Sequence, residues 1–189
     1  LGVTTVLTGD FLEQVETNHP HQLLEEWYRT STGETLINRM LGMEHKTTLA
    51  DNDLIKVGTA CNAGGVDIAY PLLNDDIIEF ATALPARLKV NGKQLRPFYK
   101  ESMANFLPNE IITKKKQGFG LPVGHWILSH PPFKVLTIES LSALSQRGWL
   151  RKDFAENLMT NLLPSHPGYY GTIAWVLVML NSWLNESNN

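Results

Sequence analysis

Residues 64–84 read GGVDIAYPLLNDDIIEFATAL, and this stretch contains the two patterns that decide the fold class. Residues 66–70 are rich in β-branched and aromatic side chains and lie between a glycine pair and Pro71, which is typical of a short strand. Beyond the proline, Asp75 and Asp76 precede a run of apolar residues, and carboxylates are favourable at the positive end of a helix dipole. We therefore expect one short strand, followed by a helix that begins near Asp75.

On both sides of this stretch, apolar residues recur with helical spacing. Asp10 is a candidate N-cap for a short helix, and Asp153 is a candidate N-cap for a later one. The other expected helices cover residues 23–28, 36–41, 51–63, 97–107, 133–144 and 172–184. The sequence thus predicts a mainly α fold, a helical bundle that carries one irregular surface built from loops. Since no linker is long enough to separate two domains, we expect a single compact unit.

Composition excludes several classes of protein. The chain has 189 residues, of which 43% are hydrophobic, enough for a core. Sixteen lysines and arginines against nineteen acids give a net charge of -3, so a nucleic-acid partner is not expected. Cys61 is the single cysteine, which excludes an internal disulfide, and the histidines lack metal-ligand spacing, so no metal site is expected. No apolar run approaches the ~20 residues of a membrane span, and we expect a cytoplasmic protein.

Two features are candidates for chemistry. Residues 114–122, KKKQGFGLP, place three lysines before a Gly-x-Gly turn, where the backbone can approach an anion closely. A lysine there could neutralise a departing pyrophosphate or donate a proton to it, although a solvated charge run explains the pattern equally well. Asp67 could orient an amine or help to remove its proton, or it could be a partly exposed strand acid.

Four segments, in this order and with this approximate spacing, resemble the glutamine-hydrolysing asparagine synthetase family. They are DLIKV at 53–57, GVDIAYPLLN at 65–74, LPNEII at 107–112 and KQGFGLP at 116–122, the last followed by Trp126. The resemblance runs from about residue 35 to the C-terminus, so we expect a helical segment at 1–34 and a synthetase-like part at 35–189. It implies the helical C-terminal portion of an α/β synthetase domain of the adenine-nucleotide-hydrolase-like, PP-loop ATPase type.

The resemblance also implies an activity. Members of the family use ATP to adenylate aspartate, release pyrophosphate, and form asparagine with ammonia taken from glutamine. Lys116 matches the family lysine that contacts the phosphates, and Gly118 belongs to the same ATP-binding loop. Asp67 stands where the family usually has glutamate. The sequence differs from the usual family pattern at Thr59 and Ala69, where arginine is usual, and at Asn74, where aspartate is usual.

The family's glutaminase domain and its Ser-Gly-Gly-x-Asp-Ser phosphate loop are not in this sequence. We therefore expect a C-terminal fragment whose partners are upstream synthetase and glutaminase portions. ATP and Mg²⁺ would act in the full-length protein, and neither is expected to bind tightly to this chain, which should be inactive alone. A truncated domain would leave apolar residues such as Trp149, Leu150, Trp175 and Trp183 at the surface, which predicts a homodimer.

Two alternatives remain open. The absent arginines at positions 59 and 69 favour a ligase for another carboxylate, such as a peptide or a sugar acid, because arginine is the usual bidentate partner of a carboxylate. The numerous apolar side chains are also compatible with a non-catalytic helical module that packs on a partner domain.

Overall fold

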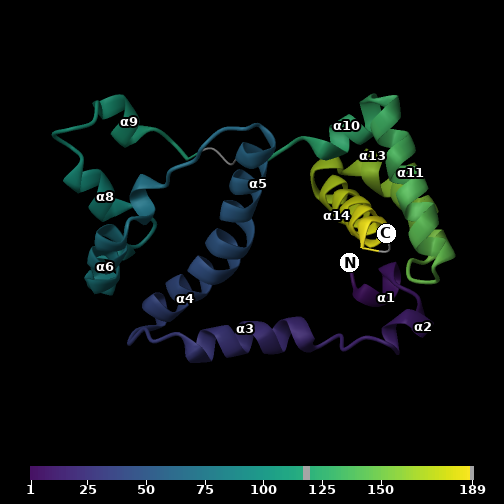
Figure 1. Ribbon diagram of the computed structural model, residues 1–189, viewed down its shortest axis with the longest axis horizontal. Helices are drawn as coiled ribbons and strands as arrows, with labels where there is room; N and C mark the ends of the chain where they lie inside the picture. The colour runs from purple at the N-terminus through teal and green to yellow at the C-terminus, as the bar shows by residue number, and fades with distance from the viewer. Residues whose placement is uncertain (117–119, 188–189) are drawn as a thin grey trace. The chain divides into compact units, whose positions relative to one another are not determined.

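The computed structural model describes residues 1–116 and 120–187, and the chain divides into two compact units. The terminal unit joins residues 1–17 to the C-terminal part that begins at 117, and the central unit consists of residues 18–116. Where one compact unit was expected, the N-terminal residues pack with the C-terminal helices, and residues 18–116 form a separate group of contacts. Helices form the regular structure of the described residues (Figure 1), which confirms the mainly α fold.

The terminal unit contains the buried core. Its N-terminal helices are α1 (Val3–Val6) and α2 (Gly9–Leu12). Its C-terminal helices are α10 (Val123–Ser129), α11 (Pro131–Gln146), α12 (Lys152–Asn157), the π-helical η3 (Leu158–Leu162), α13 (Leu163–Ser165) and α14 (Pro167–Glu186). The buried hydrophobic side chains are Val123, Ile127, Leu141, Leu144, Leu150, Phe154, Leu158, Leu163, Ala174, Leu177 and Val178. These side chains fix the helices against one another.

Backbone hydrogen bonds attach the N-terminal segment to this core. The Thr8 amide donates to the Trp149 carbonyl at 3.0 Å, and the Arg151 amide donates to the Val6 carbonyl at 3.0 Å. The Phe11 and Trp149 rings stack with their centroids 4.9 Å apart. A segment far away in sequence thus belongs to the same unit as the C-terminal helices.

Two glycines allow α10 and α14 to touch through their backbones. A Cβ atom built on Gly171 would lie 2.5 Å from the Gly124 amide nitrogen, and one built on Gly124 would lie 2.7 Å from the Pro167 carbonyl carbon. Real Cβ atoms do not approach other atoms this closely, so any side chain at either position would push the helices apart.

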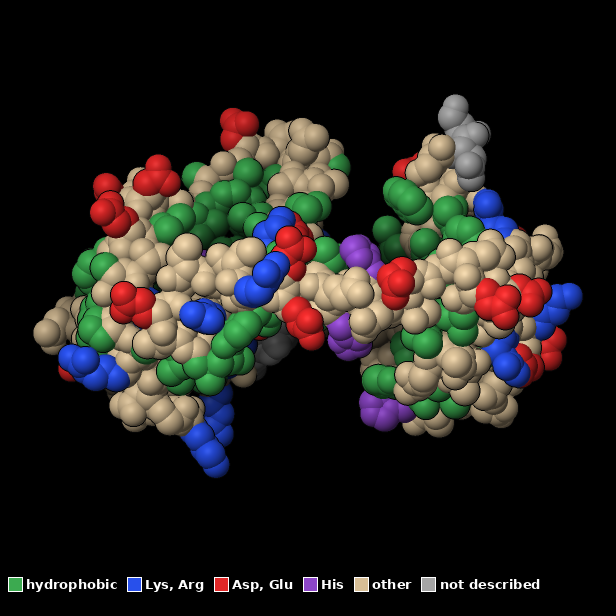
Figure 2. Space-filling model, turned by 90° about the horizontal axis from the view of Figure 1, so that it is seen from below, with side chains coloured by type: hydrophobic (Ala, Val, Ile, Leu, Met, Phe, Trp, Pro, Cys, Tyr) green, Lys and Arg blue, Asp and Glu red, His purple; other side chains and the backbone are tan. Residues whose placement is uncertain are grey.

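The central unit has no buried side chain anywhere in residues 18–116. Its elements are α3 (His19–Thr30), α4 (Leu36–Glu44), the π-helical η1 (His45–Leu54), α5 (Ile55–Ala63), the 3₁₀ turn η2 (Pro71–Leu73), α6 (Asp75–Ala83), α7 (Ala86–Lys89), α8 (Pro97–Ser102) and α9 (Asn109–Thr113). Large hydrophobic side chains are exposed on it, such as Leu36, Ile55 and Phe106, the last 82% accessible. Figure 2 shows hydrophobic side chains gathered in patches on the face of the molecule seen there.

The predicted strand at residues 66–70 is wrong. These residues have no regular secondary structure, and within the described ranges the β-pairs are two isolated bridges, Leu7–Leu150 and Asn91–Gln94. A β-branched run becomes a strand only when another segment supplies a hydrogen-bonding ladder, and residues 66–70 have no such partner. The predicted helix that begins near Asp75 is confirmed as α6.

Several predicted helix starts are also corrected. Thr8, not Asp10, is the N-cap of α2, and its hydroxyl accepts from the Phe11 amide at 3.3 Å. Asp153 lies inside the first turn of α12, after the N-cap position occupied by Arg151. The helix expected from residue 51 has no separate start, because α4, η1 and α5 follow one another without a break. No helix in the described ranges is long and apolar enough to cross a membrane.

Candidate functional site

Asp67 lies in the connection that leaves α5. The helix ends at a glycine pair, where the Gly64 amide donates to the Ala60 carbonyl at 3.0 Å and the Val66 amide donates to the Cys61 carbonyl at 3.0 Å. Gly65 between them has φ 64°, a left-handed conformation that glycine adopts without a steric penalty. This turn carries the chain away from the helix axis and leaves Asp67 exposed to solvent.

The residues after Asp67 lead into α6. The Leu73 amide donates to the Tyr70 carbonyl at 2.9 Å, which closes the 3₁₀ turn that begins at Pro71. The Asn74 side chain then caps α6 by accepting from the Asp76 amide at 2.9 Å. Asparagine and aspartate are about equally good N-caps, so the asparagine at position 74 keeps the capping function of an aspartate.

Lys116 is the last residue of the first described range, 1–116, and lies in the segment that follows α9. Lys114 is the C-cap of α9, and Lys114, Lys115 and Lys116 are all exposed. Among the described residues the ion pairs are Lys46–Asp51, Lys56–Asp53 and Arg151–Asp153, so none of them uses a lysine of this loop. Gly118, the predicted ATP-binding glycine, lies outside the described residues.

The structure places Asp67 and Lys116 in the same compact unit, but no ion pair joins them. Thr59 on α5 and Ala69 in the connection are both exposed. The described residues contain no cluster of three or more His, Cys, Asp or Glu side chains that could hold a metal ion. Asp67 and Lys116 are therefore separately accessible to a ligand and make no preformed pair with each other.

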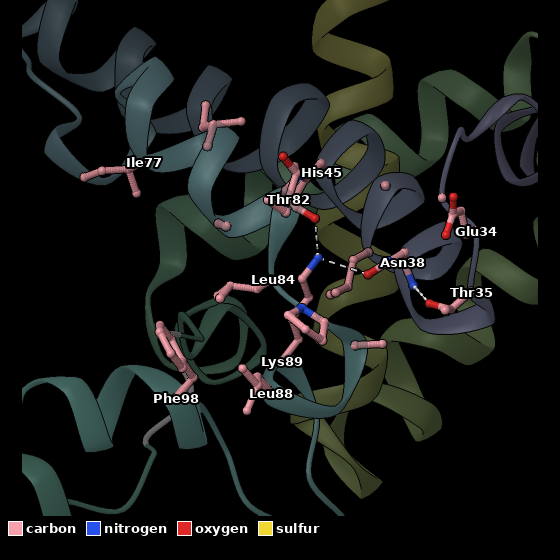
Figure 3. A pocket seen from close by; sticks show the side chains of 18 of the residues that line it. Glu34, Thr35, Asn38, His45, Ile77, Thr82, Leu84, Leu88, Lys89 and Phe98 are labelled. Atoms are coloured by element: carbon pink, nitrogen blue, oxygen red, sulfur yellow. Dashed lines mark hydrogen bonds between the residues drawn. The ribbon is translucent and has the colours of Figure 1, made fainter.

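A pocket of about 950 Å³ in the central unit is absent from the sequence-based expectations. Most of its wall is apolar and comes from η2, α6, the loop that follows α6, α7 and α8 (Figure 3). The apolar lining includes Leu72, Leu73, Ile77, Ile78, Ala81, Leu84, Leu88 and Phe98. The polar part of the lining includes Thr35 and Asn38, from the start of α4. These residues belong to segments scattered from 31 to 99, so no local motif could have revealed the pocket.

Lys89 brings a positive charge to the polar wall of this pocket. Its Nζ donates to Asn38 Oδ1 at 3.0 Å and to the Thr82 carbonyl at 3.0 Å (Figure 3). Asn38 is itself held in place, because its amide donates to the Thr35 hydroxyl at 3.1 Å. Both acceptors of Lys89 are neutral, so the geometry of the ammonium is fixed while its charge is not balanced.

Comparisons with known proteins agree with the resemblance seen in the sequence. The family model described as asparagine synthase matches residues 4–185. The match begins well before residue 35, where the resemblance was expected to start.

Relatives match over about half of the chain. Asparagine synthetase [glutamine-hydrolyzing] 1 of Bacillus subtilis (strain 168) is 22% identical over 101 residues, 53% of this chain and 16% of that protein. Putative asparagine synthetases [glutamine-hydrolyzing] of Mycobacterium bovis and of Mycobacterium tuberculosis H37Rv are each 24% identical over 100 residues, which is 53% of this chain and 15% of theirs. The chain thus matches a small fraction of the length of these relatives. No solved structure matches. Because the family model covers nearly the whole sequence, the chain belongs to the asparagine synthase family.

Proposed function

We propose that this chain is part of an ATP-dependent ligase that converts a carboxylate into an amide, with aspartate as the substrate and asparagine as the product. The observation that carries the proposal is the family match over residues 4–185. In such a reaction the carboxylate attacks the α-phosphorus of ATP, pyrophosphate leaves, and ammonia displaces AMP from the acyl-adenylate.

Lys116 is the residue to which we assign the phosphate contact. Negative charge accumulates on the leaving pyrophosphate, and a cation placed beside it stabilises that charge in the transition state. Lys116 is exposed and takes part in none of the ion pairs of the described residues, so its charge is available to an anion. We assign Asp67, also exposed, to the attacking amine, where a carboxylate can accept a hydrogen bond and then a proton.

The described residues fit only part of an ATP site. They offer the lysines of the basic loop for the phosphates, but no cluster of carboxylates that could hold Mg²⁺. The proposal therefore places the magnesium ligands and most of the phosphate cradle in upstream synthetase portions, with a glutaminase portion as the source of ammonia. No step that we assign to this chain passes through the metal.

Two alternative functions are each favoured by a specific observation. A ligase for another carboxylate, a peptide or a sugar acid, is favoured by Thr59 and Ala69, which are exposed and too short to clamp a carboxylate as arginine does. A non-catalytic helical module is favoured by the central unit, whose hydrophobic side chains are unburied. AMP formation by the full-length protein, measured with aspartate and then with other carboxylic acids, separates the three functions.

The exposed apolar surface also supports self-association, and we propose a homodimer of the isolated chain. Trp183 is 62% accessible, whereas Trp149 and Trp175 are only partly exposed, so Trp183 is the strongest candidate for a contact. Leu150, also expected at the surface, is instead buried in the core of the terminal unit. Light scattering over a hundredfold concentration range tests the dimer, and a monomer throughout that range contradicts it.

The role of Lys116 is tested by ATP–pyrophosphate exchange in the full-length protein. Lys116→Ala is expected to slow exchange by ~100-fold or more, the usual scale for the loss of one preorganised electrostatic contact. Lys114→Ala and Lys115→Ala are matched controls from the same exposed loop and should have much smaller effects. Equal losses in all three variants would indicate a diffuse basic patch, and full exchange activity in Lys116→Ala would remove the role assigned to it.

A further inference from the structure

We propose that the pocket of the central unit binds a small amphipathic carboxylate, with the carboxylate against Lys89 and a hydrocarbon or aromatic body against the apolar wall. This binding site is separate from the phosphate contact assigned to Lys116 and does not depend on the ligase activity.

The size and lining of the pocket favour a small organic ligand. Its volume of about 950 Å³ lies near the upper end of the ~300–1,000 Å³ typical of small-molecule sites. Such sites combine apolar walls with a few polar groups that fix the orientation of the ligand. Here Ile77, Ile78 and Phe98 supply apolar surface, and Asn38, Thr82 and Lys89 meet at one place in the wall (Figure 3).

The charge of the lining favours an anion. Lys89, Arg87 and Arg96 are three cations that line the pocket, and Glu34 is its one carboxylate. Glu34 forms no ion pair with Lys89, and Figure 3 shows it near Thr35, away from the Lys89 amine. The pocket therefore has an excess of positive charge that a carboxylate would reduce.

The hydrogen bonds of Lys89 leave room for that carboxylate. An ammonium group has three donors, and Asn38 Oδ1 and the Thr82 carbonyl occupy two of them. The two bonds hold the nitrogen in one position, so a ligand does not have to order a mobile lysine when it binds. A charge-assisted bond from the third N–H to a carboxylate is stronger than a bond between neutral groups.

The apolar wall favours an amphipathic ligand over a purely ionic one. A phosphate or a short dicarboxylate would leave much of the surfaces of Leu84 and Leu88 in contact with water. A ligand with one charged end and an apolar body covers these surfaces, at a gain of ~25 cal/mol for each Å² removed from water.

Calorimetric titration of the whole chain with octanoate, below its micelle concentration, tests the proposal. Octylamine and octan-1-ol have an apolar body one methylene longer than that of octanoate but carry a cationic or a neutral head, so octanoate should still bind more tightly than either. Lys89→Met keeps the apolar stem and removes the charge, and it should weaken octanoate binding by about tenfold or more. Lys93→Met is the matched control, because Lys93 does not line the pocket.

A second pair of variants tests the location without changing a charge. Ala81→Trp places a bulky ring in the pocket and should abolish octanoate binding, whereas Ala63→Trp, at an exposed position outside the lining, should leave it unchanged. Circular dichroism establishes that each variant keeps its helices. Absence of octanoate binding, equal binding of octylamine, or insensitivity to both Lys89→Met and Ala81→Trp would overturn the proposal.

Discussion

Replacement of Gly171 by alanine tests how strongly the backbone contact between α10 and α14 holds the terminal unit together. The new Cβ would lie 2.5 Å from the Gly124 amide nitrogen, and the Gly124 Cα is nearer still. Both are backbone atoms, so no side chain can rotate away, and the two helices must separate.

The magnitude follows from two opposed effects. Alanine within a helix is ~0.5–1 kcal/mol more favourable than glycine, which stabilises the variant. Overpacking in a core costs about 1–3 kcal/mol, and separation of α10 from α14 also loosens the packing of Ile127 and Ala174, both fully buried. With the propensity gain subtracted from the overpacking cost, we expect Gly171→Ala to lower the free energy of unfolding by about 1–2 kcal/mol and the midpoint temperature by several degrees.

Tryptophan fluorescence during urea unfolding is the appropriate assay, because Trp126, Trp149, Trp175 and Trp183 all belong to the terminal unit. Gly168→Ala in the same helix is the matched control. A Cβ there would have its nearest neighbour, His166 Cε1, at 3.8 Å, an ordinary contact, so this variant should be neutral or slightly stabilised. Equal stability of the two variants would refute the argument that backbone contact fixes this crossing.

Three further predictions concern single side chains. Leu158→Ala should cost ~2–5 kcal/mol in the same urea experiment, because Leu158 is fully buried and its truncation leaves a cavity. Asn74→Ala should destabilise α6 by ~0.5–2 kcal/mol, seen as faster hydrogen exchange at its first turn, whereas Asn74→Asp should keep the cap. The hydrogen bond from Arg151 lowers the pKa of Asp153, so this pairing stabilises the fold above the ordinary pKa of aspartate and is lost as pH falls through the lowered value. Asp153→Asn should remove this dependence from an acid titration followed by NMR.

Helical spacing was sufficient to locate most helices, but not to identify their caps. The expected helices at 133–144 and 172–184 correspond to α11 and α14, each longer than its apolar pattern. At α2, Thr8 and Asp10 are both competent caps by residue type. The Thr8 hydroxyl also bonds to the Gly148 carbonyl, a contact across 140 positions of sequence that no local pattern contains.

In the candidate site too, the sequence predicts the features that depend on local residues and not those that depend on distant contacts. The loop that contains Lys116 was found because its residues are contiguous and match a family motif. The composition of residues 66–70 predicts a strand, yet composition does not reveal whether a partner segment exists. The sequence does not predict the position of Lys89, because its partners, Asn38 and Thr82, come from different helices and one of the two bonds goes to a backbone carbonyl.

The distribution of buried side chains connects stability to the proposed chemistry. All buried hydrophobic side chains of the described residues lie in the terminal unit, so hydrophobic burial stabilises that unit far more than the other. Asp67 and Lys116, to which we assign the chemistry, both belong to the central unit, which buries none. Electrostatic stabilisation of a transition state requires groups that are held in place before the reaction, in a site from which water is excluded. The exposed central unit does not provide such a site by itself, and this supports the proposal that upstream synthetase portions must cover it before Lys116 can act on a phosphate.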